Sequence, residues 1–184
     1  MQRLLDHLAD RSVAIVGNAT SLLAHAWGDI IDEHDVVVRM NRGIPVDPRA
    51  QGRKFDVCCF STLRDHGAVL RQAAPTFAVW MSPKFREEYD GSIDVCFYPL
   101  QFWQALHDKL NARPSVGAMT VDLVSRSAAR AVTVIGFDFK RSGTFYAAGQ
   151  HIGPHDYAAE SRYVLDACAA KGWRFVELGV SQSA

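Results

Sequence analysis

Seven short apolar runs bounded by Gly, Asn, Pro or Asp recur along this chain of 184 residues, and they constrain its fold more than any other feature. Apolar runs without alternation are typical of strands that are buried on both faces of a parallel sheet. Between the runs lie stretches with the helical spacing of apolar residues. The expected strands are residues 12–17, 35–41, 55–60, 76–81, 93–98, 131–137 and 173–178. The expected helices are residues 2–9, 21–30, 62–73, 101–111, 117–130 and 156–171.

Strands that alternate with helices predict one α/β domain over residues 1–184, with a single doubly wound, mostly parallel, Rossmann-like sheet and helices on both faces. In such a sheet a ligand binds beyond the carboxyl ends of the strands, near the point where the strand order reverses. We also expect the loop over residues 140–154, which is long and lacks a periodic pattern, to be functional. The residues that follow the expected strands, most of them small and polar, are Asn18, Asn41, Ser61, Ser82, Pro99 and Asp138.

The charge balance argues against recognition of a polyanion. Lys plus Arg and Asp plus Glu number 20 each, so no net field draws the protein to nucleic acid or to an anionic membrane. Charges within residues 1–11 leave no apolar core for a signal peptide, and no run of about 18 apolar residues is present to span a bilayer. We expect a cytoplasmic protein without a membrane span, which reaches the inner membrane only peripherally, through a partner or a lipid-linked substrate.

The first motif is VAIVGNATS (residues 13–21), a buried strand, a turn at Gly17 and the start of a helix that Thr20 or Ser21 caps. Together these parts present backbone N–H groups and the positive end of a helix dipole, which suit a phosphate. The segment lacks the GxGxxG pattern, because Asn18 and Ala19 follow a single glycine. The alternative is a strand, turn and helix that bind nothing.

The second motif is IDEHDVVVRMN (residues 31–41), in which an acidic turn leads into a strand that ends on Arg39 and Asn41. An Asn amide at a strand end can donate to a phosphate or pair with a ribose hydroxyl while its carbonyl accepts from another group. The alternative is that Asn41 ends the strand as an ordinary turn residue.

The third motif is RPSVG (residues 113–117), which leads into an expected helix. Pro114 stiffens the backbone before the helix, Ser115 stands where an N-cap is expected, and Gly117 lets a ligand approach the first exposed N–H groups. Capping alone explains Ser115 without a ligand, but it does not explain a second helix start suited to an anion in the same fold.

The fourth motif is HDYAAE (residues 155–160), at the start of the last expected helix. A histidine at a helix N-terminus feels the positive end of the dipole, which lowers its pKa and keeps the imidazole neutral and able to accept a proton. His155 is therefore a candidate general base. The alternative is a solvated loop histidine beside a helix that Asp156 caps.

These segments occur in one order and together resemble the sialylmotifs of the animal-type sialyltransferase family. The large motif of that family reads about CAVVGNS followed by IDxHDxVLRxN, the small motif reads PSTG with a later strand ending in GF, and the very small motif reads HxxxxE. The matching positions in this chain are residues 13–18 and 31–41, residues 114–117 and 135–137, and His155 with Glu160. The resemblance covers about residues 12–165.

The chain departs from the family at its disulfide. The two motif cysteines that the family joins are absent: Val13 stands at the first position, and Ala128 or Ala129 near the second. Loss of both partners fits a reducing compartment, so the chain resembles a short bacterial cytoplasmic relative. The cysteines that it does have form no CxxC pair and are expected to be small buried hydrophobes: Cys58, Cys59, Cys96 and Cys168.

A second departure concerns the third motif of the family, a His followed by two aromatic residues. Its counterpart here is only Thr144-Phe145-Tyr146, so the histidine that contacts the leaving phosphate in the family is missing. Tyr146 or the nearby His151 is the expected substitute.

The resemblance implies a glycosyltransferase-A-variant fold and an inverting transfer of sialic acid or Kdo from a CMP-activated donor to a hydroxyl of a glycan or a lipid-linked glycan. No cofactor or metal is expected, because the sequence has no DxD or similar carboxylate cluster and helix-start N–H groups can stabilise a leaving phosphate. The expected catalytic residue is His155, with His151 and Tyr146 as further candidates, while Glu160 positions the loop and helix. The expected donor-binding residues are Asn18, Asn41, Ser115, Val116, Gly117 and Gly136.

Two other classes of protein compete with this interpretation. One is an NAD(P)-dependent Rossmann enzyme, which is disfavoured because the chain lacks GxGxxG and its second expected strand ends in Arg-Met-Asn instead of an acidic residue. The other is a non-catalytic nucleotide- or glycan-binding module, which would bind CMP without turning over a donor.

We expect CMP, but not AMP or NAD, to raise the melting temperature of the protein. A ligand that binds only the folded state stabilises it by RT ln(1 + [L]/Kd), and Asn18, Asn41 and the Ser115 helix start are expected to form one CMP site. Thermal melts with each nucleotide measure the shift. Equal shifts for AMP and CMP, or a shift with NAD alone, contradict the CMP assignment.

Overall fold

A computed structural model describes residues 1–147 and 153–178 of the chain. These residues form a sheet of seven parallel strands in the order β5-β4-β3-β2-β1-β6-β7. The strands are β1 (Ser12–Val16), β2 (Val36–Met40), β3 (Val57–Phe60), β4 (Phe77–Trp80), β5 (Cys96–Phe97), β6 (Ala131–Ile135) and β7 (Arg174–Phe175). The helices are α1 (Gln2–Leu8), η1 (Thr20–Ala24), α2 (Gly28–Asp32), α3 (Pro48–Gln51), α4 (Leu63–Ala73), η2 (Arg86–Glu88), α5 (Leu100–Leu110), α6 (Val116–Ser125) and α7 (Tyr157–Lys171). The predicted parallel α/β sheet is confirmed, and all seven expected strands are present in shortened form.

The expected helix over residues 21–30 is wrong. Its place is taken by the 3-10 helix η1 and, after a break at residues 25–27, by the short helix α2. α2 begins at Gly28, where a Cβ would lie 2.0 Å from the carbonyl oxygen of Pro48, so it packs directly against α3. Helix α3 was not expected from the sequence, although Asp47 and Pro48 form an ordinary helix start of N-cap and first-turn proline.

Helix α6 ends at Ser125, five residues before the expected end at Arg130. The hydroxyls of Ser125 and Ser127 donate to the carbonyl oxygens of Asp122 and Val124, at 2.7 and 2.8 Å. Such local side-chain bonds compete with continuation of the helix.

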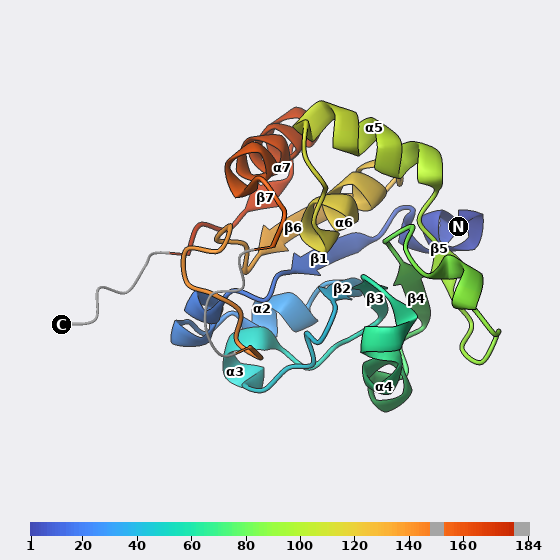
Figure 1. Ribbon diagram of the computed structural model, residues 1–184. Coiled ribbons are helices and arrows are strands. Elements are labelled where there is room, and N and C mark those ends of the chain that lie inside the picture. The colour runs from blue at the N-terminus through green and yellow to red at the C-terminus, as the bar shows by residue number, and fades with distance from the viewer. Residues whose placement is uncertain (148–152, 179–184) are drawn as a thin grey trace.

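Alternate residues of the central strands face opposite sides of the sheet, as the period of two requires. One face carries Val13, Ile15, Val36, Val38, Met40, Val57 and Cys59, which pack with α1, α5, α6 and α7. The other face carries Ala14, Val16, Val37, Cys58 and Phe60, in two smaller clusters. Figure 1 shows α5, α6 and α7 on one side of the sheet and α2, α3 and α4 on the other. The expectation of buried cysteines is confirmed for Cys58, Cys59 and Cys168, while Cys96 is partly buried.

The strand order reverses at β1. From β1 the sheet grows outward through β2, β3, β4 and β5, and the chain then returns to place β6 on the other side of β1. Gly17 follows β1 and Gly136 follows β6, so these glycines stand at the switch point, where open α/β sheets bind their ligands.

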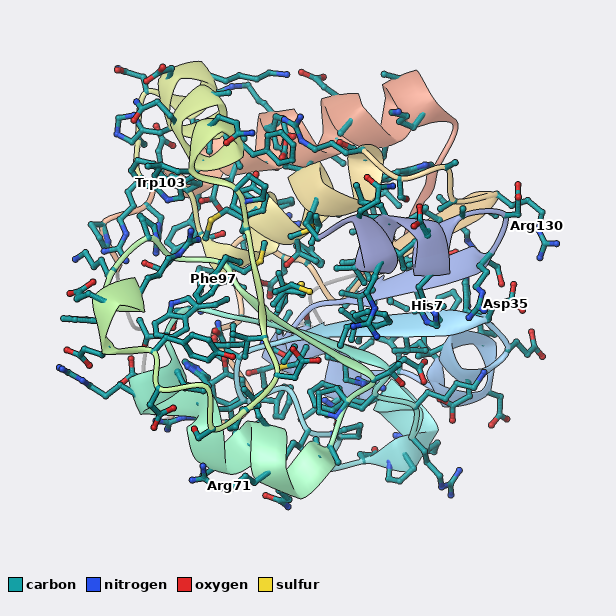
Figure 2. The ribbon with its side chains drawn as sticks, turned by 90° about the vertical axis from the view of Figure 1, so that its right-hand side faces the viewer. His7, Asp35, Arg71, Phe97, Trp103 and Arg130 are labelled. Carbon is teal, nitrogen blue, oxygen red and sulfur yellow. The ribbon has the colours of Figure 1, made fainter. Side chains whose placement is uncertain are left out.

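Polar contacts join the amino ends of β1, β2 and β6. The Asp35 carboxylate accepts from the amide and the hydroxyl of Ser12, both at 2.8 Å, and lies 3.2 Å from Arg130. The bond from the Ser12 amide is the largest cause that holds the pKa of Asp35 below its usual value. Figure 2 shows Asp35 and Arg130 together on the opposite side of the molecule from Trp103.

The helices of the described ranges, 1–147 and 153–178, include none that is both long and apolar enough to cross a bilayer.

We expect Gly17→Ala to destabilise the fold strongly. A Cβ at residue 17 would lie 2.2 Å from the carbonyl oxygen of Gly136, so β1 and β6 would have to separate, at a cost of about 1–3 kcal/mol or more. Gly67→Ala is the matched control: Gly67 lies within α4, the nearest atom to its added Cβ is at 3.4 Å, and a helical Gly→Ala change stabilises by about 0.5–1 kcal/mol. Urea unfolding measures both changes. Equal free energies of unfolding for the two variants would contradict the close approach.

Candidate active site

A cavity of about 440 Å³ opens at the carboxyl ends of the strands. It is lined by residues that follow β1, β2, β3, β4 and β6 and by the starts of α6 and α7. Of the residues expected after strands, it contains Asn18, Asn41, Ser61, Ser82 and Asp138. Among the predicted site residues, it brings together Asn18, Asn41, Ser115, Val116, Gly117, Gly136, Tyr146 and His155. His151 lies outside the described residues.

Most of the amides after β1 are already used within the protein. The N–H groups of Gly17 and Ala19 donate to carbonyls of the β6 end, at 2.7 and 3.1 Å. Those of Thr20 and Ser21 donate to the loop of residues 142–143, at 3.3 and 2.9 Å. Ala19 occupies the N-cap of η1 without a side-chain bond, so the predicted cap at Thr20 or Ser21 is wrong. These four amides are occupied because β6 and its following loop lie against them, a tertiary contact that the motif alone does not reveal. No described residue accepts from the backbone amide of Asn18, which lies between them at the cavity.

Asn18 joins the ends of β1 and β2. Its side-chain amide donates to the carbonyl oxygen of Met40 at 2.9 Å and to the hydroxyl of Tyr146 at 3.3 Å. Burial raises the pKa of Tyr146, while hydrogen bonds from Asn18, the Arg42 backbone and Asn41 oppose that rise. The side chains of Asn18, Asn41 and Tyr146 thus form one polar cluster in the cavity lining.

Asn41 has the left-handed backbone expected of a turn residue, with φ 52°, and it also has a specific side-chain contact. Its Oδ1 accepts from the Ser61 amide at 3.0 Å, which ties the end of β2 to the end of β3. Because the carbonyl oxygen is used in this way, the amide nitrogen of Asn41 is the part that faces Tyr146 and the cavity.

The start of α6 is held by a buried carboxylate. Ser115 is the N-cap, and its Oγ accepts from the Ala118 amide at 3.2 Å. The same hydroxyl and the Ser115 amide donate to the two carboxylate oxygens of Glu160, both at 2.6 Å. Glu160 is 4% exposed, and burial is the largest cause that raises its pKa, against the lowering effect of the two bonds from Ser115. The predicted cap is confirmed, and its hydroxyl hydrogen is directed to Glu160.

The N–H groups of the first turn of α6 are only partly used by described residues. Ala118 and Met119 donate to Ser115, but no described residue accepts from the amides of Val116 and Gly117, which line the cavity. A Cβ at Gly117 would lie 3.1 Å from the Phe137 ring, so glycine keeps this turn close to the end of β6. Two donors at the positive end of a ten-residue helix are thus available to an anionic group.

His155 lies directly before Asp156, which caps α7 by accepting from the Ala159 amide at 2.9 Å. The imidazole Nδ1 is 2.8 Å from the carbonyl oxygen of Arg113. A carbonyl oxygen only accepts, so Nδ1 carries the proton and Nε2 is the acceptor atom of the neutral ring. The His155 ring also makes an edge contact with Tyr157.

Three features of the cavity were not expected from the sequence: Lys140, Trp103 and the organising role of Asp138. The Asp138 carboxylate is 4% exposed and accepts from the amides of Lys140 and Ser142 and from the Ser21 hydroxyl, at 3.1, 2.8 and 3.2 Å. Lys140 belongs to the long loop that was expected to be functional, and this was the only indication in the sequence that it lines the cavity. The helical pattern of α5 does not indicate that Trp103 lines the cavity. Within the described part of the chain, no group of three His, Cys, Asp or Glu side chains is placed to hold a metal ion.

The fold of this chain resembles that of solved sialyltransferases. The chain resembles the crystal structure of a mammalian sialyltransferase in complex with Gal-beta-1-3GalNAc-ortho-nitrophenol, with a TM-score of 0.64 and 18% identity over 97% of this chain and 78% of that one. It also resembles the sialyltransferase CstII from Campylobacter jejuni in complex with a substrate analogue, cytidine-5'-monophosphate, with a TM-score of 0.61 and 16% identity over 92% of this chain and 80% of that one. The fold is therefore that of sialyltransferases.

A sequence comparison adds a similarity over part of the chain. Residues 5–49 match the model of glycosyltransferase family 29 (sialyltransferase). This segment contains the first motif and the second, so the relationship predicted from those motifs is confirmed there. No protein of curated function matches the sequence.

We expect Glu160→Gln to destabilise the protein by about 1–3 kcal/mol, because an amide nitrogen cannot accept the bond that a carboxylate oxygen takes from Ser115. Asp166→Asn, on an exposed position of the same helix, is the control and should leave the free energy of unfolding almost unchanged. Urea denaturation compares the two variants. If both are as stable as the wild type, Glu160 does not hold the start of α6.

Proposed function

We propose that this protein is a glycosyltransferase that moves sialic acid from a CMP-activated donor to a sugar hydroxyl. One observation carries the proposal: two amides at the start of α6, from which no described residue accepts, and the imidazole at the start of α7 line the same cavity at the strand switch point. Family 29 similarity over residues 5–49 and the sialyltransferase fold support it. We also propose that residues 1–184 act as one domain, because the seven described strands form one sheet.

The donor assignments follow the available hydrogen-bond donors. The amides of Val116 and Gly117 are proposed to bind the phosphate or the sugar carboxylate, with Ser115 holding the helix start in place. Asn18 and Asn41 are proposed to contact the nucleotide through their side chains. Gly136, which has no side chain, is proposed to leave space for the nucleotide in the cavity. The Campylobacter jejuni sialyltransferase binds cytidine-5'-monophosphate in its structure, which supports a cytidine nucleotide in this cavity as well.

His155 is proposed as the general base of an inverting transfer. The acceptor oxygen forms a bond to the anomeric carbon while its proton moves to Nε2 of His155. The bond from the anomeric carbon to the phosphate oxygen breaks, and its electron pair stays on the leaving CMP. The Arg113 carbonyl holds Nδ1–H and so presents Nε2 as the accepting atom. Tyr146, and His151 outside the described residues, remain candidates for contacts to the phosphate.

Three features of the proposal go beyond the family relationship: the choice between sialic acid and Kdo, the glycan or lipid-linked acceptor, and a cytoplasmic location peripheral to a membrane. The disaccharide in the complex of the mammalian enzyme supports a galactose-containing acceptor as the first to be tried.

The most direct test is incubation with CMP-sialic acid and with CMP-Kdo, scored as CMP release with and without candidate glycans. Acceptor-dependent release is the expected result. CMP binding without any turnover would instead favour a non-catalytic binding module, and absence of both would contradict the proposal. The same assay with EDTA tests the expectation that no divalent ion is needed, since loss of turnover that Mg²⁺ or Mn²⁺ restores would contradict it.

We expect His155→Ala to lower turnover by roughly 10²–10⁴-fold, the usual contribution of a positioned base, while the affinity for CMP changes little. A sugar hydroxyl attacks well only if its proton is removed as the new bond forms. Initial rates and CMP titrations on the same variant separate the two effects. His151→Ala is the comparison: if it abolishes transfer while His155→Ala does not, the base has been misassigned.

A further inference from the structure

Lys140 places a cationic side chain in the cavity at the end of β6. It is half-buried and lines the same cavity as Asn18, Val116 and Gly117. The other charged side chains among the described lining residues are Asp138, Glu160 and Arg113, together with the titratable His155. The two carboxylates are already engaged, Asp138 with its own loop and Glu160 with Ser115.

The backbone around Lys140 has an unusual conformation. Phe139 and Lys140 both have left-handed conformations, with φ of 53° and 68°, which non-glycine residues rarely adopt. The Asp138 carboxylate, 4% exposed, compensates by accepting from the Lys140 amide at 3.1 Å and the Ser142 amide at 2.8 Å. Such strain persists where the surrounding contacts determine it, and it is concentrated at ligand sites.

The ammonium group is held next to the segment that follows β1. Its Nζ donates to Oγ1 of Thr144, and Thr144 pairs with Ala19 in an isolated antiparallel bridge. The next residue, Phe145, donates its amide to the Asn18 carbonyl at 3.1 Å. An ammonium has three N–H donors, and Thr144 takes one of them.

The environment of Lys140 favours an anionic partner. Burial is the largest cause that lowers the pKa of its ammonium, and the charge of Asp138 opposes this effect. A second negative charge in the cavity would favour the protonated form further. No such group is supplied by the described carboxylates of the lining, because both are committed elsewhere.

We infer that Lys140 binds the phosphate of the nucleotide and neutralises the charge that develops on it during transfer. The inference rests on the proposed function and deepens it. As the bond between the anomeric carbon and the phosphate oxygen breaks, the electron pair passes to that oxygen, and the ammonium stabilises the added charge without giving up a proton. The acceptor proton goes to His155, so Lys140 needs no change of protonation state.

Binding of CMP and of cytidine, measured by calorimetry, tests the inference apart from turnover. Lys140→Gln should weaken CMP by roughly 10- to 100-fold, the value of one hydrogen bond to a charged group, and leave cytidine unchanged. Lys140→Arg should retain much of the CMP affinity. Arg141→Gln removes a positive charge from the next, exposed position of the same loop and should change neither ligand.

The other outcomes overturn the inference, and they show whether the proposed function fails with it. Unchanged CMP affinity in Lys140→Gln removes the phosphate contact while the proposed function stands. Equal loss of CMP and cytidine means that Lys140 only supports the loop. A wild-type protein that binds neither CMP nor cytidine contradicts the proposed function itself.

Discussion

The close approach of two backbones at the strand switch point is the constraint on which the site depends. The Gly136 carbonyl oxygen lies 2.2 Å from the place of a Cβ on residue 17, and Gly136 itself has a φ of 76°. Only glycine satisfies both conditions without strain. Because β1 and β6 meet this closely, the loop after β6 lies over the end of β1, and the cavity opens toward the starts of α6 and α7.

That contact also limits how many amides the turn after β1 can offer to an anion. Two segments of this chain have the sequence of a phosphate-binding turn, but four of the five backbone amides of residues 17–21 donate to β6 and its loop, which leaves that of Asn18. The amides of Val116 and Gly117 have no acceptor among the described residues. Counting where each backbone donor goes therefore shows how many donors each turn can offer to a ligand, although both turns have the glycine and the polar residues expected of a binding site.

The charged groups of the cavity divide in the same way. Glu160 and Asp138 are buried acceptors that organise a helix start and a loop, respectively, and each accepts from at least two donors. The acidic groups thus act as internal supports, while the cationic side chains of Lys140 and Arg113 and the imidazole of His155 also line the cavity. The proposed donor substrate is anionic. Because both buried carboxylates are hydrogen-bonded, they add no unpaired negative charge to the cavity that would oppose its binding.

The sequence by itself determined the sheet, because strands buried on both faces require continuous apolar runs and each run is readable in isolation. It also determined the caps of α6 and α7, since Ser115 and Asp156 bond to amides only three residues away. The tertiary structure alone decided the break between η1 and α2, the use of four amides after β1 and the tautomer of His155. Each of these depends on a partner distant in the sequence, such as Ser142 for Ser21 or Arg113 for His155. Local patterns contain no information about which distant carbonyl or hydroxyl the fold will bring within hydrogen-bond distance.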